Sequence, residues 1–178
     1  LTPAGQLPPG RFFAGSAFDP VRQRMFIFSS ENFGVLQDDL WELDLEPTPT
    51  WVQVPLVAPR PSPRFSPAML YDPVRDRILL FGGVSEGGAF PGDTYALSLG
   101  ATPTWSQLFT TGQPPQSPGT TTVYDSHRDR LVVFAADRVF ALSLSGTPAW
   151  TQLATMGTPP PSRIYGAGVY DQATDRMV

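Results

Sequence analysis

One seven-residue theme returns four times along this chain, and its clearest copy reads Tyr71-Asp72-Pro73-Val74-Arg75-Asp76-Arg77. The other three copies occupy residues 18–24, 124–130 and 170–176. Self-similarity at a period of about fifty residues is the signature of proteins built from stacked supersecondary units. The sequence therefore predicts a repeat protein, and each copy of the theme marks the same position in one unit.

A second anchor repeats in step with the first. Trp51, Trp105 and Trp150 each follow an aromatic residue by ten positions. The third unit is the shortest, and the residues it lacks fall between Phe134 and Arg138, where the first two units have long connections. Because connections between secondary-structure elements tolerate changes of length, this deletion leaves the predicted strands of the third unit intact.

Each complete unit contains four predicted strands. In the second unit, short runs rich in β-branched and aromatic residues span residues 66–71, 77–81, 94–99 and 105–108. The 21 prolines and 16 glycines lie between such runs and mark turns. No window keeps apolar residues at the helical period over three turns. The Asp-Pro stretch after the first strand predicts a tight turn, held by Asp72 and Arg77.

The predicted fold is all-β. Four-stranded antiparallel sheets that repeat at this period are expected to pack as the blades of a β-propeller. The chain is predicted to hold three complete blades and the first half of a fourth, which is a partial propeller. These repeats span residues 8–61, 62–115, 116–160 and, incompletely, 161–178, and together they make one propeller segment over residues 1–178.

The units resemble the Kelch repeat. Phe81-Gly82-Gly83 at the end of the second strand, an aromatic residue in the third strand and a tryptophan at a fixed distance after it are similar to the Kelch motif. Ser29-Ser30 and Ala135-Ala136 replace the double glycine in the other two complete units. With the strands of each blade named a to d in chain order, the resemblance implies a propeller that binds partners on the face formed by the b–c and d–a connections.

Two groups of residues on that face are candidates for binding. The b–c connections contribute Glu31, Asn32, Phe33, Glu86 and Phe90. Arg11, Arg64 and Arg163 stand where strand a begins, which in a propeller is near the mouth of the central channel. Guanidinium groups there can clamp a carboxylate with two parallel hydrogen bonds. A structural alternative stays open for each group: solvated loop tips, and arginines bonded to backbone carbonyls or to a neighbouring acid.

Composition narrows the classes of function. Sixteen acidic and twelve basic residues leave a formal charge of −4 without a basic run, so no nucleic-acid partner is expected. The apolar runs are far shorter than the ~20 residues that cross a bilayer, which predicts no membrane insertion. There is no cysteine and His127 is the only histidine, so the sequence predicts no metal site, no cofactor and no catalytic residues.

The predicted function is a noncatalytic scaffold that binds a protein or a glycan through the b–c and d–a face. The alternative is a segment of a larger propeller enzyme, a sialidase-like hydrolase or a carbohydrate oxidase, whose catalytic residues lie outside these residues. The lysine-free, cysteine-free and proline-rich units resemble those of large exported bacterial Kelch-like proteins, which favours an extracellular or periplasmic location.

The phase of the repeats also bears on assembly. Leu1 falls just after a predicted strand d, and Val178 falls inside a predicted strand b. An open run of blades exposes apolar faces that neighbouring blades normally cover. We therefore expect this segment to be continued by further blades of the same chain or closed by a second copy.

Overall fold

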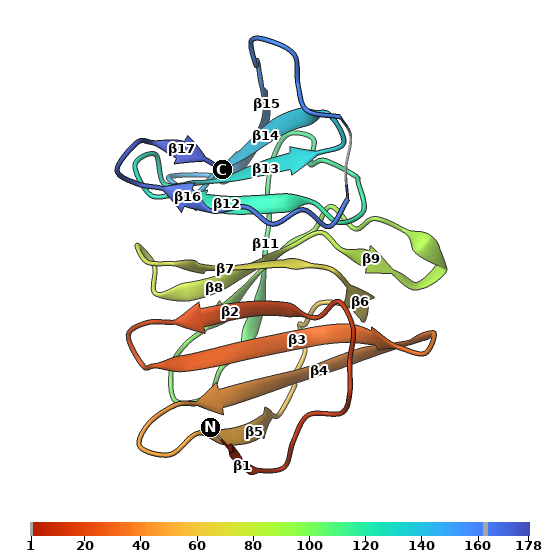
Figure 1. The fold of residues 1–178 in the computed structure, drawn as a ribbon, viewed down its shortest axis with the longest axis vertical. Coiled ribbons are helices and arrows are strands. Elements are labelled where there is room, and N and C mark those ends of the chain that lie inside the picture. Colours follow the sequence, from red (N-terminus) through yellow and green to blue (C-terminus); the bar gives the residue numbers. More distant parts are fainter. Residues whose placement is uncertain (1, 162–163) are drawn as a thin grey trace.

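The computed structural model describes residues 2–161 and 164–178, which form successive β-sheets (Figure 1). Blade 1 contains β2 (Gly15–Asp19), β3 (Arg24–Asn32), β4 (Val35–Asp44) and β5 (Thr50–Val54). Blade 2 contains β7 (Ala68–Asp72), β8 (Arg77–Phe81), β10 (Thr94–Ser98) and β11 (Trp105–Leu108). Blade 3 contains β12 (Thr121–Asp125), β13 (Arg130–Ala135), β14 (Arg138–Ser143) and β15 (Ala149–Leu153). Blade 4 contains the hairpin of β16 (Tyr170–Asp171) and β17 (Arg176–Met177).

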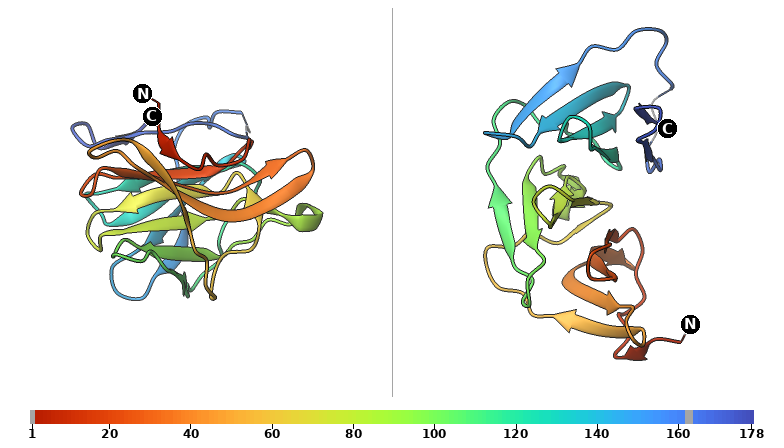
Figure 2. Two further views of the ribbon diagram at one scale, coloured as in Figure 1. Left: turned by 90° about the horizontal axis from the view of Figure 1, so that it is seen from below. Right: turned by 90° about the vertical axis from the view of Figure 1, so that its left-hand side faces the viewer.

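The blades follow one another along an arc, as the right-hand view of Figure 2 shows. Within each complete blade the strands pair antiparallel in the order a, b, c, d. Outside the blades, β6 (Arg64–Phe65) pairs with β9 (Val84–Ser85), and a short 3-10 turn, η1, covers Glu86–Gly88. The described residues contain no α-helix. The all-β prediction of propeller blades that form a partial propeller is confirmed.

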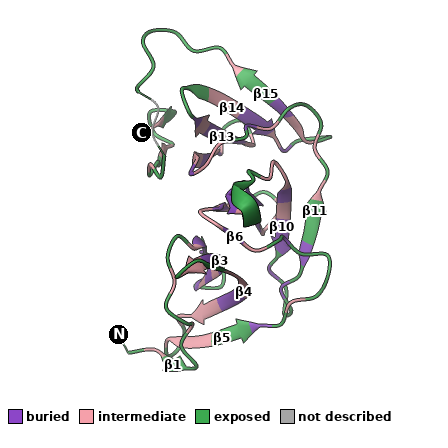
Figure 3. Ribbon diagram, turned by 90° about the vertical axis from the view of Figure 1, so that its right-hand side faces the viewer, coloured by how far each residue is buried: buried purple, intermediate pink, exposed green. Residues whose placement is uncertain are grey.

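The hydrophobic core lies between blades. Phe28 of blade 1 contacts Trp105 of blade 2 with ring centroids 5.2 Å apart, and Phe81 of blade 2 contacts Trp150 of blade 3 at 4.6 Å. Figure 3 shows buried segments on the strands, and exposed segments both at the connections and on much of the outer strands β11 and β15. Because burying one large apolar side chain contributes about 1.5–3 kcal/mol, these repeated contacts hold consecutive blades together.

Blades 1 and 3 carry an extra edge strand that the four-strand pattern does not predict. β1 (Ala4–Gly5) pairs in parallel with β5, and Thr111 makes the same parallel bridge to Ala149. The glycines at this place, Gly5 and Gly112, have φ of +83° and +78°. A Cβ atom on either would lie 2.3 Å from a tryptophan carbonyl oxygen of the neighbouring strand, so this close approach requires glycine.

The b–c connection of blade 1 is a β-ribbon rather than the expected loop. β3 and β4 stay paired out to Asn32 and Val35, across an irregularity between Phe28 and Ser30. At this bulge Ser29 has φ of +56°, and its Oγ accepts a hydrogen bond from the Arg64 backbone N–H at 2.8 Å. The bulge re-aims the ribbon and ties it to the segment that leads into blade 2.

The turn between strands a and b is held by an aspartate in every blade. Asp72 accepts the backbone N–H groups of Val74 and Arg75 at 3.1 and 3.2 Å, and Arg77 Nε donates to the same carboxylate at 2.9 Å. The carboxylate is fully buried. The predicted turn pair of Asp72 and Arg77 is therefore present, and its role is structural.

A second arginine of the turn in blades 1, 2 and 3 reaches the next blade. Arg75 donates from both Nη atoms to Asp129 of blade 3, at 2.9 and 2.7 Å, and Tyr124 donates to the same carboxylate at 2.8 Å. Arg22 bonds Asp76 in the same way, and Arg128 bonds Asp175. We call these three bidentate pairs the interblade clamps. They join blade 1 to 2, 2 to 3 and 3 to 4.

Candidate binding face

The b–c connections lie on one side of the arc, opposite the a–b turns (Figure 1). Phe33 stands at the tip of the blade 1 ribbon with 90% of its surface exposed. Beside it, the Glu31 carboxylate accepts the Gly34 backbone N–H at 2.6 Å, which fixes the turn, and Asn32 is the last residue of β3. In blade 2, Glu86 opens the 3-10 turn and Phe90 follows it, partly exposed.

Five aromatic side chains gather on this face, and we call them the aromatic cluster: Phe12, Phe13, Phe33, Phe65 and Tyr165. Phe12 packs edge-on against Phe33, with ring centroids 6.1 Å apart. Phe13 lies 6.1 Å from Phe65 and stacks on Tyr165 of blade 4 at 5.3 Å with an interplanar angle of 22°. The rings thus form two groups of contacts, which are linked only by the adjacency of Phe12 and Phe13 in the chain. One group reaches the ribbon tip of blade 1, and the other reaches the segments that precede strand a of blades 2 and 4.

A repeated backbone conformation positions the stacked pair. Phe13, Ser66, Gly119 and Tyr165 occupy the same place in their blades, and all have φ between +52° and +60°. Neighbouring members are hydrogen bonded: Ser66 N–H donates to the Phe13 carbonyl at 2.7 Å, and Tyr165 N–H donates to the Gly119 carbonyl at 2.9 Å. The left-handed conformation is costly for a bulky residue, which makes Phe13 and Tyr165 notable.

Two hollows lie next to the cluster. One, of about 390 Å³, is lined by first strands and their leading segments, including Ser16, Met69, Thr122 and Gly168. It is the space around which the arc bends. The other, of about 470 Å³, lies between the b–c connections of blades 1 and 2 and is lined by residues such as Leu36 and Glu86.

The arginines at the start of strand a are paired inside their own blades. Arg11 donates from both Nη atoms to Asp39, each at 2.8 Å, and Arg64 bonds Asp93 at 2.6 and 3.0 Å. Arg64 is fully buried and also donates to the Gly82 carbonyl. These contacts match the structural alternative for the two residues. Arg163 lies outside the described residues.

The Arg11 pair also sets the protonation state of its acid. Burial acts to raise the pKa of Asp39, but the Arg11 guanidinium and the Trp41 indole N–H hold that pKa below its usual value. The carboxylate is therefore ionised at neutral pH and stays paired with Arg11. Two donors from one guanidinium and one from an indole leave this acid little freedom to bind anything else.

The described residues contain no cluster of three or more metal-ligating side chains, and no helix among them is long and apolar enough to cross a membrane. His127 lies in the a–b turn of blade 3, half exposed, with Nδ1 3.6 Å from Asp175 and its ring edge-on to Tyr170. It is part of the contact between blades 3 and 4.

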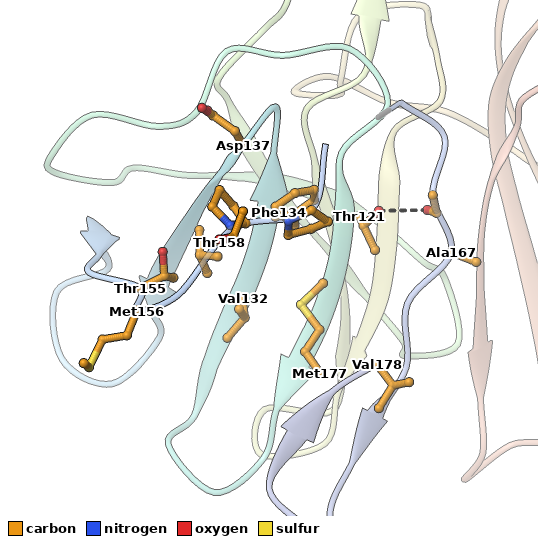
Figure 4. Close-up of a pocket in the computed structure, with 14 residues that line it drawn as sticks. Thr121, Val132, Phe134, Asp137, Thr155, Met156, Thr158, Ala167, Met177 and Val178 are labelled. Atoms are coloured by element: carbon orange, nitrogen blue, oxygen red, sulfur yellow. Dashed lines mark hydrogen bonds between the residues drawn. The ribbon is translucent and has the colours of Figure 1, made fainter. Parts of the chain in front are cut away.

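A further hollow, of about 560 Å³, lies against blade 3 (Figure 4). Val132, Phe134 and Val139 of blade 3 line it together with Met156 and Met177. Thr121 Oγ1 donates to the Gly166 carbonyl at its edge. Phe134 occupies the place that Phe28 and Phe81 hold in blades 1 and 2, where each contacts a tryptophan of the next blade. This hollow is therefore an interblade space.

Known proteins resemble this chain in sequence and in architecture. The KLHDC2/KLHL20/DRC7 Kelch-repeats domain model matches residues 1–174. The chain belongs to the Kelch-repeat family. The solved structure of YjhT is similar to it, with a TM-score of 0.71 and 17% sequence identity over 92% of this chain. This Kelch segment spans 58% of the length of that structure. No match is found among curated proteins.

Sequence reasoning found Phe33 but missed the rest of the aromatic cluster. Phe12, Phe13 and Tyr165 lie in proline-rich connections, where no strand alternation points to a face. The signal was present in the repeat: the two residues after Arg11 and Arg163 are large and apolar in both units. An alignment of the repeats at these positions therefore indicates the exposed aromatic residues from the sequence alone.

Proposed function

We propose that this Kelch segment is a noncatalytic scaffold that binds a protein or glycan partner through the b–c and d–a face. Kelch propeller domains generally mediate protein binding. The observation that carries the proposal is the exposure of the aromatic cluster: Phe12 and Phe13 are each more than half exposed, and Phe33 is almost wholly exposed.

Exposed aromatic groups on a rigid scaffold are suited to binding. A ring has few rotatable bonds, so it supplies a large contact area at a small entropic cost, and aromatic residues are enriched at the centres of interfaces. Phe33 and Phe12 brace one another, and Phe13 is braced by Tyr165. A sugar ring or an apolar peptide side chain can lie against such a surface, with Glu31 and Glu86 at its border.

The experiment compares variants against panels of candidate partners. Phe33→Ala and Phe90→Ala remove exposed rings from the face, and Val74→Ala removes an exposed apolar group from the opposite, a–b side. We expect binding of a true partner to weaken by about tenfold or more in Phe33→Ala, because truncated hot spots cost ~2 kcal/mol. Val74→Ala should bind as the unmodified protein does. If every ligand found binds both face variants unchanged, the face is wrong.

We also propose that further blades of the same chain, or a second copy of it, cover the hollow beside Phe134. In both complete junctions a phenylalanine at this place contacts a tryptophan from strand d of the next blade. Trp51 shows that the chain itself carries a tryptophan of the required kind on β5. The fitting occupant is a blade edge that places an indole over Phe134.

The proposed location is outside the cytoplasm, extracellular or periplasmic. Its support is the composition alone, because the repeats hold no lysine and no cysteine. Fractionation of cells that make the natural protein tests it: recovery in the soluble cytoplasmic fraction alone overturns this location and leaves the binding proposal standing.

A further inference from the structure

Blades 1 and 2 share an arginine–aspartate pair at the binding face, and its geometry is the same in both. The arginine lies eight residues before the aspartate of the a–b turn, and the partner acid lies two residues before the aromatic residue of strand c. Register confirms that these aromatic residues are equivalent: Trp41 pairs with Ile27, Tyr95 with Leu80. Both guanidinium groups meet a carboxylate with two hydrogen bonds.

Blade 3 breaks this pattern at both positions. Phe140 pairs with Val133 and is therefore the equivalent aromatic residue of its strand c. Eight residues before Asp125 stands Ser117 instead of arginine, and two residues before Phe140 stands Arg138 instead of aspartate. The acid of the pair is missing, and the cation now stands on strand c.

A pocket of about 400 Å³ occupies this place in blade 3. The b–c connection is a two-residue turn here, with Ala135 paired to Arg138, so no long ribbon covers the space as in blade 1. Gln113, Gln116, Ser117, Asp137 and Arg138 are among the residues that line the pocket. Its polar wall thus holds one cation, amide and hydroxyl groups, and the carboxylate of Asp137.

The Arg138 guanidinium has spare hydrogen-bonding capacity. Its Nε atom lies 3.7 Å from an Asp137 carboxylate oxygen, and both side chains are about 60% exposed. Among the residues that the structure describes, no acceptor lies within hydrogen-bonding distance of its Nη atoms. An exposed ion pair at this distance is weak, so Asp137 leaves most of the guanidinium charge unmatched. By contrast, Arg11 and Arg64 each have both Nη atoms bonded to one carboxylate.

We propose that the blade 3 pocket binds the carboxylate of an acidic side chain from a protein partner, and that Arg138 holds it with paired hydrogen bonds. The partner would supply the acid that Asp39 and Asp93 supply within blades 1 and 2. A short acidic side chain fits, because aspartate is the acid in both internal examples. The Ser117 hydroxyl and the Gln113 amide can donate to the same group. This site is separate from the aromatic cluster and does not depend on it.

The experiment titrates the full chain with Nα-acetyl-aspartic acid amide and follows backbone amide signals by NMR. We expect saturable shifts at Ala136, Asp137 and Arg138, and none with the neutral Nα-acetyl-asparagine amide. Binding should weaken with added salt. Arg138→Gln should weaken it by about tenfold, as expected for losing hydrogen bonds to a charged group. Arg176→Gln is the matched control, because Arg176 is exposed and lies on blade 4, and it should leave binding unchanged.

Two further variants separate this site from a general effect of charge. Asp137→Asn should tighten binding, because it removes the competing carboxylate beside Nε. The double variant Ser117→Arg, Arg138→Asp rebuilds the internal pair of blades 1 and 2 and should abolish binding while the chain stays folded. Equal binding in Arg138→Gln, equal binding of the neutral probe, or the absence of saturable shifts would each overturn the proposal. Tighter binding of glucuronate than of the aspartate probe would instead assign the site to an acidic glycan.

Discussion

Two positions of the repeat, one occupied by a tyrosine and one by an aspartate, vary together from blade to blade. Tyr124 donates to Asp129, five residues later in the chain, while that aspartate receives the arginine of the preceding blade. The same pairing holds in blades 2 and 4, whereas blade 1 has Phe18 and Gln23 at the two positions. Where the phenol is lost the acid is lost too, which is expected if the hydroxyl serves to orient the carboxylate for the clamp.

Replacing Arg75 by methionine tests the strength of one clamp. The change removes both hydrogen bonds to Asp129 and the bond to the Leu144 carbonyl, and it leaves the buried Asp72 with fewer donors. We expect the free energy of unfolding to fall by about 1–3 kcal/mol, measured by urea denaturation. Arg60→Met is the control, because Arg60 pairs with Asp38 at an exposed site, and it should cost under about 0.5 kcal/mol. Equal losses would contradict a special role for the clamp.

Lowering the pH should weaken the contact between blades 2 and 3. The Arg75 guanidinium holds the pKa of Asp129 below its usual value, and the Tyr124 hydroxyl also lowers this pKa. Burial raises the pKa, but by less than Arg75 lowers it. Because the folded-state pKa is lowered, the stabilisation is complete above the unfolded-state pKa of about 3.9 and is lost as the pH falls below it. We expect thermal stability to be steady from about pH 5 to 7 and to drop below about pH 4. In Asp129→Asn this acid dependence should be smaller; an unchanged dependence would rule out Asp129 as a contributor.

Sequence alone reached some side-chain contacts and not others, for a physical reason. The pair of Asp72 and Arg77 is local and returns in each unit, so its geometry follows from the turn. Arg11 and Asp39 lie 28 residues apart, and only strand register brings them together. The sequence alone is therefore consistent with two roles for Arg11, binding of a ligand carboxylate and pairing with an acid of the same chain. The position of the partner strand decides between them.

At the level of elements, the edge strand of blades 1 and 3 depends on a single backbone conformation. Thr111 N–H donates to the Pro148 carbonyl and Trp150 N–H donates to the Thr111 carbonyl, each at 2.9 Å. The chain then passes Gly112, where an added Cβ atom would lie 2.3 Å from the Trp150 carbonyl oxygen. In blade 2 the residue equivalent to Gly112 is Ala58, which carries a Cβ atom, and the described residues show no parallel bridge there.

Gly112→Ala tests this strand. Its added Cβ would sit 2.3 Å from the Trp150 carbonyl oxygen, so the edge strand must move away. Gly146→Ala is the control, since Gly146 also has positive φ but nothing lies within 4 Å of its added Cβ. Left-handed strain alone costs about 1–2 kcal/mol, and we expect Gly112→Ala to lose at least about 1 kcal/mol more in thermal or urea unfolding. Equal losses would show that the strand adds no stability.

The four main strands of each complete blade could be predicted because alternation, turn residues and a repeat agree on them. The edge strands could not, since a two-residue parallel pairing leaves no alternation to detect. The b–c ribbon of blade 1 was expected as a loop for a related reason. Its polar and glycine content is typical of connections, and the bulge at Ser29 hides the register that extends it.

For the whole molecule, the decisive feature is the hollow beside Phe134, because an apolar surface of this kind is normally covered. We expect the isolated 178-residue chain to associate, and mass measurement at micromolar concentration tests this. Phe134→Gln makes the hollow polar and should weaken association, whereas Val74→Gln on the a–b side should not. A soluble monomer that unfolds cooperatively would contradict the proposal that the hollow needs a cover.

The interblade clamps give the repeats a polarity, and this makes some blades interchangeable and others not. Each clamp runs from an arginine of one blade to an aspartate of the next, so blades 2 and 3, which have both groups, can donate and receive. Blade 1 has Gln23 in place of the receiving acid, and blade 4 has Thr174 in place of the donating arginine. A tandem duplication of residues 62–115 would therefore leave every charge matched. A chain lengthened in this way should have a melting temperature no lower than that of its parent. A chain lengthened by a copy of blade 1 would leave one arginine opposite Gln23 without its acid, and its melting temperature should be lower.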